Sequence, residues 1–280
     1  MDNLSGVLNH LSISARVFYT GAMCGISNFN EPQVDQGHIH LVKQGQVKIE
    51  STIHPTIEVN EPTLIFCPKP FSHRIVSQPD SDAELVCASV EIGSSSSNPI
   101  ANALPDFVVV PLTSSEMLEH SVAWLFKEAF QEQQARQPML DRLSEIVIIQ
   151  LLRYVLEKEQ SLQGLLRGLT HPQISKLIQA LHQQPEKNWN LEEMASIAAM
   201  SRSKFAQIFK DTLNQTPADY LTDWRISIAQ TYLDKGYPVN WVANKVGYEN
   251  SSVLARVFKK KTGVSPSQWR QRKTGMEPVD

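Results

Sequence analysis

Residues 239–273 hold side chains that could bind a polyanion. Eight of them are Lys or Arg and Glu249 alone is acidic, so the stretch has a net charge of +7. The whole chain has a formal net charge of −3, because residues 1–184 contribute −7 and residues 185–280 contribute +4. A basic surface of this kind binds phosphate groups. Charge runs are also typical of solvated helix faces, so both interpretations stay open on charge alone.

A repeated pattern lies in the same half of the chain. Two apolar residues four positions apart, a lysine, a proline and an aromatic residue recur 49 positions later. The first copy is Phe205, Phe209, Lys210, Pro217 and Tyr220, and the second is Leu254, Phe258, Lys259, Pro266 and Trp269. The apolar periodicity predicts helices over 191–198 and 202–213, then over 239–246 and 251–262. Two helices joined by a tight turn form a helix-turn-helix unit, so the chain is predicted to contain two.

The second helix of each unit is predicted to present a polar face opposite its apolar one. Arg and Gln on such a face can contact base edges, Ser and Ala permit close approach, and Lys suits phosphate. The alternative is an ordinary polar helix surface. The predicted DNA-binding residues are Arg202, Ser203, Ala206, Gln207, Lys210, Asn250, Ser252, Ala255, Arg256 and Lys259.

A single helix is expected to connect the two units. Pro217 suits a helix start, and an apolar stripe then runs to Asp234-Lys235-Gly236, where the helix is expected to end. A connection of this kind would hold two reading helices at a fixed separation. They could then enter successive major grooves on one face of DNA, about 34 Å apart.

The N-terminal part has a different pattern. Short segments rich in branched residues alternate with turns over 39–42, 46–50, 63–67 and 84–91, which predicts a β-barrel or sandwich. An amphipathic helix is predicted over 139–158, and its apolar stripe either packs on the barrel or pairs with a second copy. Residues 161–172, with two glycines and one proline, are the best candidate for a linker. The predicted fold class is α+β, with a β-barrel and following helices before an all-α C-terminal domain.

Residues 171–280 resemble the DNA-binding domain of the arabinose-regulator (AraC/XylS) family of bacterial transcription regulators. The motifs that match are Val246-Gly247-Tyr248, Phe258-Lys259, Gly263-Val264-Ser265-Pro266 and Trp269-Arg270. The first unit departs from the family pattern at Ala199 and Asn214, where glycine is usual. Asn tolerates the left-handed conformation, so the fold expected from the resemblance is unchanged.

The N-terminal region is similar to the cupin-like sensor domain of a subgroup of that family. The similarity lies in His40-Leu41-Val42-x2-Gly45 and in Leu64-Ile65-x2-Pro68-x4-His73-Arg74. It implies a sensor domain over 1–165, with a helical dimerisation segment, ahead of the DNA-binding domain over 171–280.

Three histidines follow part of the metal-binding pattern of cupin enzymes. That pattern has a His-x-His pair, a Glu four or five residues later and a distant His. His38, His40 and His73 supply the histidines, but Gln44 and Gly45 stand where the Glu is expected. Three histidines can still bind zinc. A metal at these residues and a metal-free barrel both stay open.

Two cysteines offer a second sensing chemistry. Cys24 and Cys87 fall near cysteine positions of regulators in this subgroup that resemble oxidant sensors, and two thiols brought together can form a reversible disulfide. Cys67 is expected to take no part in this response. Cys87 lies in an apolar run, so a simple core role is the alternative. A small organic effector in the barrel mouth remains a third interpretation.

Composition restricts the remaining classes of protein. The chain has 280 residues, 41% of them hydrophobic, and lacks an apolar stretch near the roughly 18 residues that span a bilayer. The first residues lack the pattern of a secretion signal, and three cysteines are too few for a disulfide framework. The expected location is therefore the cytoplasm, without a membrane partner.

These observations predict a DNA-binding transcription regulator that answers a small signal, such as an oxidant, through its N-terminal domain. It is expected not to be an enzyme and to need no cofactor, with zinc as the exception to test. The expected partners are double-stranded DNA, an effector, RNA polymerase and a second copy of the chain. The alternative is a metal-dependent cupin enzyme with a DNA-binding tail.

Overall fold

The structure is a computed structural model that describes residues 3–9, 11–23, 25–29, 36–70, 72–77, 81–93, 99–158 and 164–274, without the side chains of 28–29 and 272–274. The chain divides into two compact units. Unit 1 comprises Met1–Ser12, Ile92–Ala103 and Ser161–Asp280, and unit 2 comprises Ile13–Glu91 and Leu104–Gln160. The predicted domain limits of 1–165 and 171–280 stay predictions.

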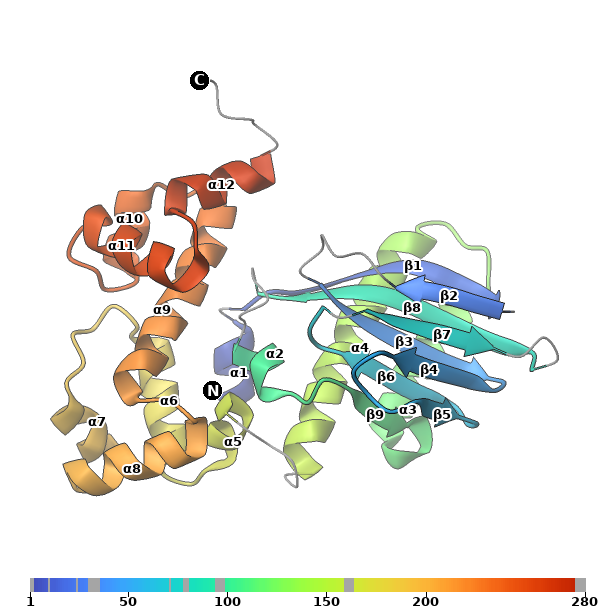
Figure 1. The fold of residues 1–280 in the computed structure, drawn as a ribbon, viewed down its shortest axis with the longest axis horizontal. Coiled ribbons are helices and arrows are strands. Elements are labelled where there is room, and N and C mark those ends of the chain that lie inside the picture. Colours follow the sequence, from blue (N-terminus) through green and yellow to red (C-terminus); the bar gives the residue numbers. More distant parts are fainter. Residues whose placement is uncertain are drawn as a thin grey trace. The chain divides into compact units, whose positions relative to one another are not determined.

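Unit 2 is built on two β-sheets (Figure 1). The five-stranded sheet has the order β1 (Ile13–Met23), β8 (Ala83–Ile92), β3 (Gly37–Gln44), β6 (Thr63–Cys67) and β9 (Val108–Pro111). The four-stranded sheet has the order β2 (Gly25–Phe29), β7 (His73–Ser77), β4 (Val47–Ser51) and β5 (Ile57–Val59). The strand pairs whose register is described are antiparallel. The cupin-like barrel and the mixed α and β fold class expected from the sequence are confirmed.

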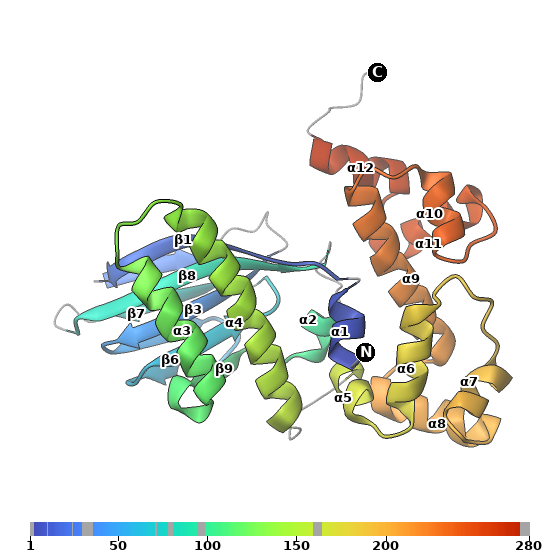
Figure 2. The ribbon, with the colours of Figure 1, turned by 180° about the vertical axis from the view of Figure 1, so that it is seen from behind.

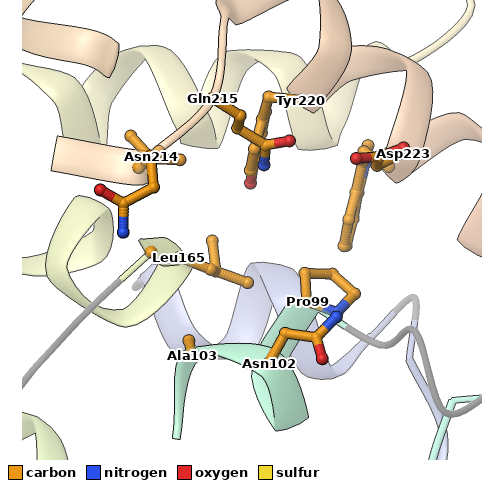
Figure 3. Close-up of a pocket in the computed structure, with 11 residues that line it drawn as sticks. Pro99, Asn102, Ala103, Leu165, Asn214, Gln215, Tyr220 and Asp223 are labelled. Atoms are coloured by element: carbon orange, nitrogen blue, oxygen red, sulfur yellow. The ribbon is translucent and has the colours of Figure 1, made fainter. Parts of the chain in front are cut away.

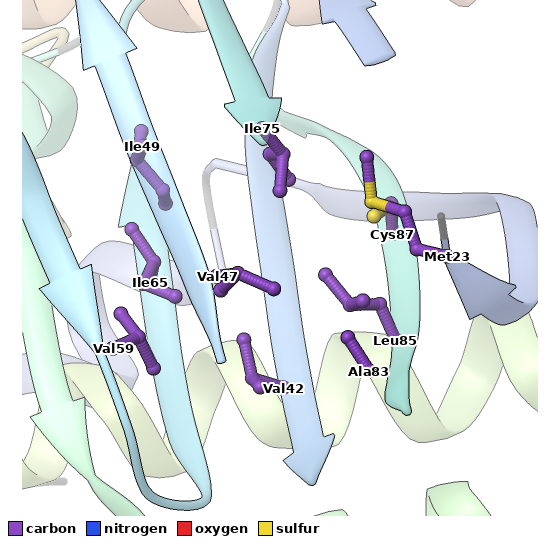
Figure 4. Packing of buried hydrophobic residues seen from close by; sticks show 10 residues of the cluster. All are labelled: Met23, Val42, Val47, Ile49, Val59, Ile65, Ile75, Ala83, Leu85 and Cys87. Carbon is purple, nitrogen blue, oxygen red and sulfur yellow. The ribbon is translucent and has the colours of Figure 1, made fainter. Parts of the chain in front are cut away.

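Side chains from both sheets meet in an apolar interior (Figure 4). Alternate residues of a strand point to one face, so Val42 of β3 and Leu85 of β8 lie opposite each other and face inward. Ile49 of β4 and Ile75 of β7 come from the other sheet. The four segments predicted as strands correspond to β3, β4, β6 and β8, and their predicted ends differ from the observed ones by at most two residues.

Two helices cover the outer face of the five-stranded sheet, as Figure 2 shows: α3 (Glu116–Ala129) and α4 (Arg136–Lys158). They follow a short 3-10 turn, η1 (Leu112–Ser114). Asp141 of α4 accepts a hydrogen bond from the backbone N–H of Val17 in β1, at 2.9 Å. The predicted apolar stripe is buried within the single chain at Leu140, Leu143, Val147 and Leu151. The alternative in which this stripe pairs with a second copy is therefore wrong for these side chains.

Unit 1 is helical. Its helices are α1 (Asn3–Leu8), α2 (Pro99–Ala103), α5 (Gly164–Thr170), α6 (Ile174–Gln183), α7 (Leu191–Ile197), α8 (Arg202–Leu213), α9 (Pro217–Asp234), α10 (Val239–Lys245), α11 (Ser251–Thr262) and α12 (Pro266–Thr274). Helix α1 packs on α6, and α2 packs on α5. No helix in the described ranges has the length and apolar character needed to cross a membrane.

The linker predicted over 161–172 is wrong for residues 164–170, which form α5. Leu165, Leu166 and Leu169 of this helix are buried. Gly168 lies at a close contact between α5 and α6, because a Cβ there would lie 2.6 Å from Cδ1 of Ile178 and that side chain would have to shift. Gly168, one of the two glycines that indicated a linker, therefore permits a contact between two helices.

Candidate nucleic-acid interface and histidine-cysteine cluster

The first helix-turn-helix unit consists of α7 and α8. Asn190 caps α7, because its Oδ1 accepts a hydrogen bond from the N–H of Glu193 at 2.9 Å. Phe205 and Phe209 bury the inner face of α8. In the turn, Ala199 has a φ of 52°, the left-handed conformation for which glycine is the usual residue. The departure from the family pattern at Ala199 therefore keeps the turn.

The second unit consists of α10 and α11. Gly247 stands in its turn with a φ of 78°. A Cβ there would lie 2.7 Å from the carbonyl oxygen of Glu186, so glycine is required by space as well as by conformation. The Oδ1 of Asn250 accepts a hydrogen bond from the N–H of Val253 at 3.0 Å and caps α11. Both second helices, 202–213 and 251–262, have the predicted bounds.

One arginine of the connecting helix α9 contacts the loop before the first unit and the turn of the second. Nε of Arg225 donates a hydrogen bond to the carbonyl oxygen of Pro185 at 2.7 Å, and Nη2 donates to that of Lys187 at 2.8 Å. Its guanidinium carbon lies 5.6 Å from the ring centre of Tyr248 in the second turn. The loop before α7 is thereby fixed to the turn of the second unit, and the predicted continuous connecting helix is confirmed.

The outer faces of α8 and α11 present the predicted DNA-binding residues. Eight of these side chains are exposed: Arg202, Ser203, Gln207, Lys210, Asn250, Ser252, Arg256 and Lys259. Ala206 and Ala255 are half-buried beside them. The buried residues on the opposite side are Phe205, Phe209, Leu254 and Phe258. Each helix therefore has one face committed to the core and one open to a ligand.

Two of these side chains have partners inside the first unit. Nε2 of Gln207 donates to both carboxylate oxygens of Asp211, at 2.9 and 3.0 Å. Arg202 forms an exposed ion pair with Glu192 at 3.9 Å. Exposed pairs of this kind contribute about 0–1 kcal/mol, so DNA can displace them.

In unit 2 the three predicted histidines and two cysteines face the interior of the barrel. On β3, His38 lies opposite Cys67 of β6, and His40 lies opposite Cys87 of β8. His73 faces them from β7 in the other sheet. The Nε2 atoms of His40 and His73 are 2.8 Å apart, and their possible ligand atoms and the Cys67 sulfur all lie within 4.8 Å of one another.

The structure thus brings two of the three predicted histidines into one group and places the third beside it. The ring of His38 stacks 6.1 Å from that of His40 and meets the edge of His73 at 5.5 Å, measured between ring centres. Sequence reasoning missed Cys67, which takes the third position. The signal that could have found it is the β3–β6 pairing, which places Cys67 beside the His-x-His pair. Cys24 lies outside the described residues.

Burial controls the protonation of this cluster. It lowers the pKa of His40 well below the ordinary value and that of His38 to about 4, with His73 adding to both shifts. Both imidazoles are therefore neutral at pH 7 and can act as metal ligands. Burial also raises the pKa of the thiols of Cys67 and Cys87 well above the ordinary value. Neither thiol is ionised at pH 7 without a cation beside it.

A cavity of about 280 Å³ lies within unit 1, below the start of α9 (Figure 3). Leu165, Tyr220 and Trp224 supply apolar surface, and Gln215 and Asp223 supply polar groups. Nε2 of His182 lies 2.6 Å from the Tyr220 hydroxyl, and Asp223 forms an ion pair with Lys261 of α11 at 2.6 Å. The ring centre of Tyr220 also lies 5.7 Å from that of Phe209 in α8, so the cavity borders residues that contact both helix-turn-helix units.

Comparison with known proteins agrees with this architecture. The cupin family model matches residues 2–157, and a helix-turn-helix domain model matches residues 194–272. A transcriptional regulator named AlkR from Acinetobacter baylyi is 31% identical over 180 residues, which are 62% of this chain and 59% of the relative. The RCS-specific transcriptional activator RclR from Escherichia coli is 27% identical over 248 residues, 85% of this chain and 86% of the relative.

Among solved structures, fatty-acid-bound ToxT from Vibrio cholerae matches with a TM-score of 0.43 and 15% identity, over 96% of this chain and 97% of that one. The chain spans 59% and 57% of the length of the first two curated relatives, the second from Streptomyces antibioticus. The cupin model covers more than half of the chain, and the helix-turn-helix model covers both duplicated units except the start of α7. The chain therefore belongs to the cupin family through its N-terminal half and to the AraC family of helix-turn-helix regulators through its C-terminal half.

Proposed function

We propose that this protein is a sequence-specific DNA-binding transcription regulator whose α8 and α11 enter successive major grooves. The observation that carries the proposal is the duplicated unit, in which each second helix exposes basic and polar residues opposite a buried face. A major groove admits one α-helix, and two such helices on one face of DNA are separated by about 34 Å. The contacts of Arg225 with the loop before α7 and with Tyr248 in the second turn support a fixed separation.

The groove-facing residues divide by chemistry. Arg256 and Gln207 can make two hydrogen bonds to one base, whereas Lys210 and Lys259 suit phosphate. Ser203, Ser252, Ala206 and Ala255 are small enough for close approach of the helix to the groove. Arg202 and Asn250 stand near the N-terminal ends of α8 and α11, where contacts to DNA are made in this class of motif.

Selection of binding sites from random DNA by the full chain tests this proposal. Arg256→Ala is expected to cost about 1–3 kcal/mol on the selected site and to relax the preference at one base position. Lys259→Ala is expected to weaken binding on all sequences alike and to reduce the salt dependence. Equal losses on every sequence for both variants would show that Arg256 does not read a base.

The N-terminal half is proposed to receive a small signal, and an oxidant acting at Cys24 and Cys87 is one candidate. The burial of Cys87 and the raised pKa of its thiol argue for slow reaction with oxidants. Cys24→Ser and Cys87→Ser are each expected to abolish an oxidant effect on DNA binding, with Cys67→Ser as the comparison. Wild-type responses in both single variants would exclude this pair. A small organic effector is the other candidate.

A regulator is favoured over a metal-dependent cupin enzyme with a DNA-binding tail. The relatives are named as transcriptional regulators, and Gln44 and Gly45 stand where cupin enzymes have a metal-binding Glu. Metal-dependent turnover by the full chain in a substrate screen would reverse this preference.

A homodimer, contact with RNA polymerase and a cytoplasmic location belong to the same proposal. The burial of Leu140, Leu143, Val147 and Leu151 in α4 supports a dimer surface made of other residues. Sedimentation of the full chain with and without DNA measures the oligomeric state directly.

A further inference from the structure

We propose that His40, Cys67 and His73 form a three-coordinate site for monovalent copper inside the cupin barrel. Their possible ligand atoms lie within 4.8 Å of one another, and the Nε2 atoms of the two histidines are 2.8 Å apart. An ion bonded to nitrogen and sulfur at about 2.0–2.3 Å holds its ligand atoms roughly 3–4 Å apart. The three side chains therefore need only small rotations to surround one ion.

The site is built into the sheets. The three ligands come from β3, β6 and β7, so both sheets contribute, and each side chain is at least 98% buried. Residues two apart on a strand share a face, so His38 and His40 occupy successive inward positions of β3. His38 is the residue paired directly with Cys67 of β6. Strand pairing thus fixes His40 relative to Cys67, and the 2.8 Å contact between His40 and His73 joins the two sheets at the site.

The ligand set and its surroundings select the metal. Within the described residues, the group contains two imidazoles and one thiol and lacks a carboxylate. Thiolate is a soft ligand that favours monovalent copper and zinc over hard cations. One thiolate neutralises Cu⁺ completely, whereas Zn²⁺ would leave one positive charge in an apolar interior, where an uncompensated charge is costly. Charge balance therefore favours copper.

Binding changes the protonation of a single ligand. The Cys67 thiol loses its proton to solvent as the sulfur–copper bond forms, and the two imidazoles bind as neutral groups. The half-buried His38, stacked beside His40, provides a further imidazole next to the site and a route for the ion. Copper binding rests on the barrel alone, so it can be tested apart from DNA binding.

The test uses the full chain, reduced and without oxygen, titrated with Cu⁺ against a chromophoric copper chelator. One copper ion per chain is expected, and X-ray absorption of that complex should show two nitrogen neighbours and one sulfur neighbour. Binding weaker than the chelator, or a copper environment without sulfur, overturns the proposal. A zinc titration runs in parallel, and retention of zinc in the presence of equimolar Cu⁺ also overturns it.

Variants assign the ligands. Cys67→Ser and His73→Gln are each expected to weaken copper binding by about 100-fold or more, since loss of a supporting residue alone costs 10–100-fold. Cys87→Ser is the matched control for Cys67→Ser, because Cys87 lies on β8, the other strand paired with β3. His54→Gln is the matched control for His73→Gln, because both histidine rings contact Phe107. Both controls should keep one copper ion. Equal losses of copper affinity in the ligand variants and in the controls overturn the assignment. Circular dichroism verifies that each variant is folded. If a variant unfolds, the X-ray absorption spectrum of the wild-type copper complex decides whether nitrogen and sulfur bind the ion.

Discussion

The two helix-turn-helix units share one fold and differ in charge. Residues 191–213 hold three basic and three acidic side chains, whereas residues 239–262 hold five basic side chains and Glu249. The same contrast appears at matching positions of the second helices. Gln207 stands where the second unit has Arg256, and Asp211 stands where it has Lys260. The second unit therefore offers more positive charge to the DNA backbone than the first, beside the base contact proposed for Arg256.

The turns differ at one matching position as well. Ala199 of the first unit and Gly247 of the second both have a positive φ, 52° and 78°. The second turn is packed against the carbonyl of Glu186 and the guanidinium of Arg225, and a Cβ at Gly247 would meet both at 2.7 Å. The second unit thus depends on glycine because the connection between the units passes over it.

The largest effect is expected from breaking this connection with Gly247→Ala. Overpacking costs about 1–3 kcal/mol and a left-handed alanine about 1–2 kcal/mol. We expect the free energy of unfolding to fall by about 2–4 kcal/mol, measured by urea denaturation of the full chain with tryptophan fluorescence. Gly263→Ala is the matched control, since its φ is 80° and nothing lies within 4 Å of the added Cβ. Equal losses in both variants would show that the contact with Glu186 is not limiting.

The charge contrast is tested by two lysines at matching positions. Lys259→Ala is expected to weaken DNA binding by about 1 kcal/mol, and Lys210→Ala by about half as much, because Asp211 already reduces the potential around Lys210. Each substitution should lower the salt dependence by at most one phosphate contact. Mobility shifts at several salt concentrations measure both quantities. A larger loss for Lys210→Ala would reverse the assignment of the two units.

The helical half could be predicted from the sequence more closely than the barrel. The bounds of α8 and α11 follow from local features, because the caps, the period of the apolar residues and the Gly263 stop all lie within the helix or beside it. The strands β1, β2, β5, β7 and β9 were not predicted, since pairing between distant segments decides where they form. The part played by Cys67 was missed for the same reason, because it depends on the register between β3 and β6.

Two local signals did not define the environment of their residues. Gly164 and Gly168 indicated a linker, but the contact with Ile178 uses the missing side chain of Gly168 to bring two helices together. The stripe of α4 has the same period whether it faces a sheet or a second helix, so the sequence left both alternatives open. Its burial against its own unit, with Asp141 bound to β1, decides between them.

A smaller effect is expected when the internal partner of Gln207 is removed. Asp211→Ala releases the Gln207 amide for DNA and removes one negative charge from the reading face. We expect binding to tighten by about 0.5–1 kcal/mol, in the range of an exposed charge contact. Asp219→Ala is the control, since this exposed carboxylate lies in the first turn of α9, where it contacts Thr216. Weaker binding by Asp211→Ala would indicate that the Gln207–Asp211 pair orders the side chain for reading.

The smallest effect concerns the turn that lacks glycine. Ala199→Gly relieves a left-handed alanine, which costs about 1–2 kcal/mol, and adds backbone entropy to the unfolded chain worth about 0.4–1 kcal/mol. The net result should be a stabilisation of about 0.5 kcal/mol, detected as a higher urea midpoint of the full chain. Ala198→Gly is the comparison, because this neighbour has a φ of −74° and gains no relief, and it loses a buried methyl group as well. It should be destabilising by about 0.5–1 kcal/mol. Destabilisation by both substitutions would show that the first turn accommodates Ala199 without strain. The turns of the first and second units would then differ in conformation as well as in packing.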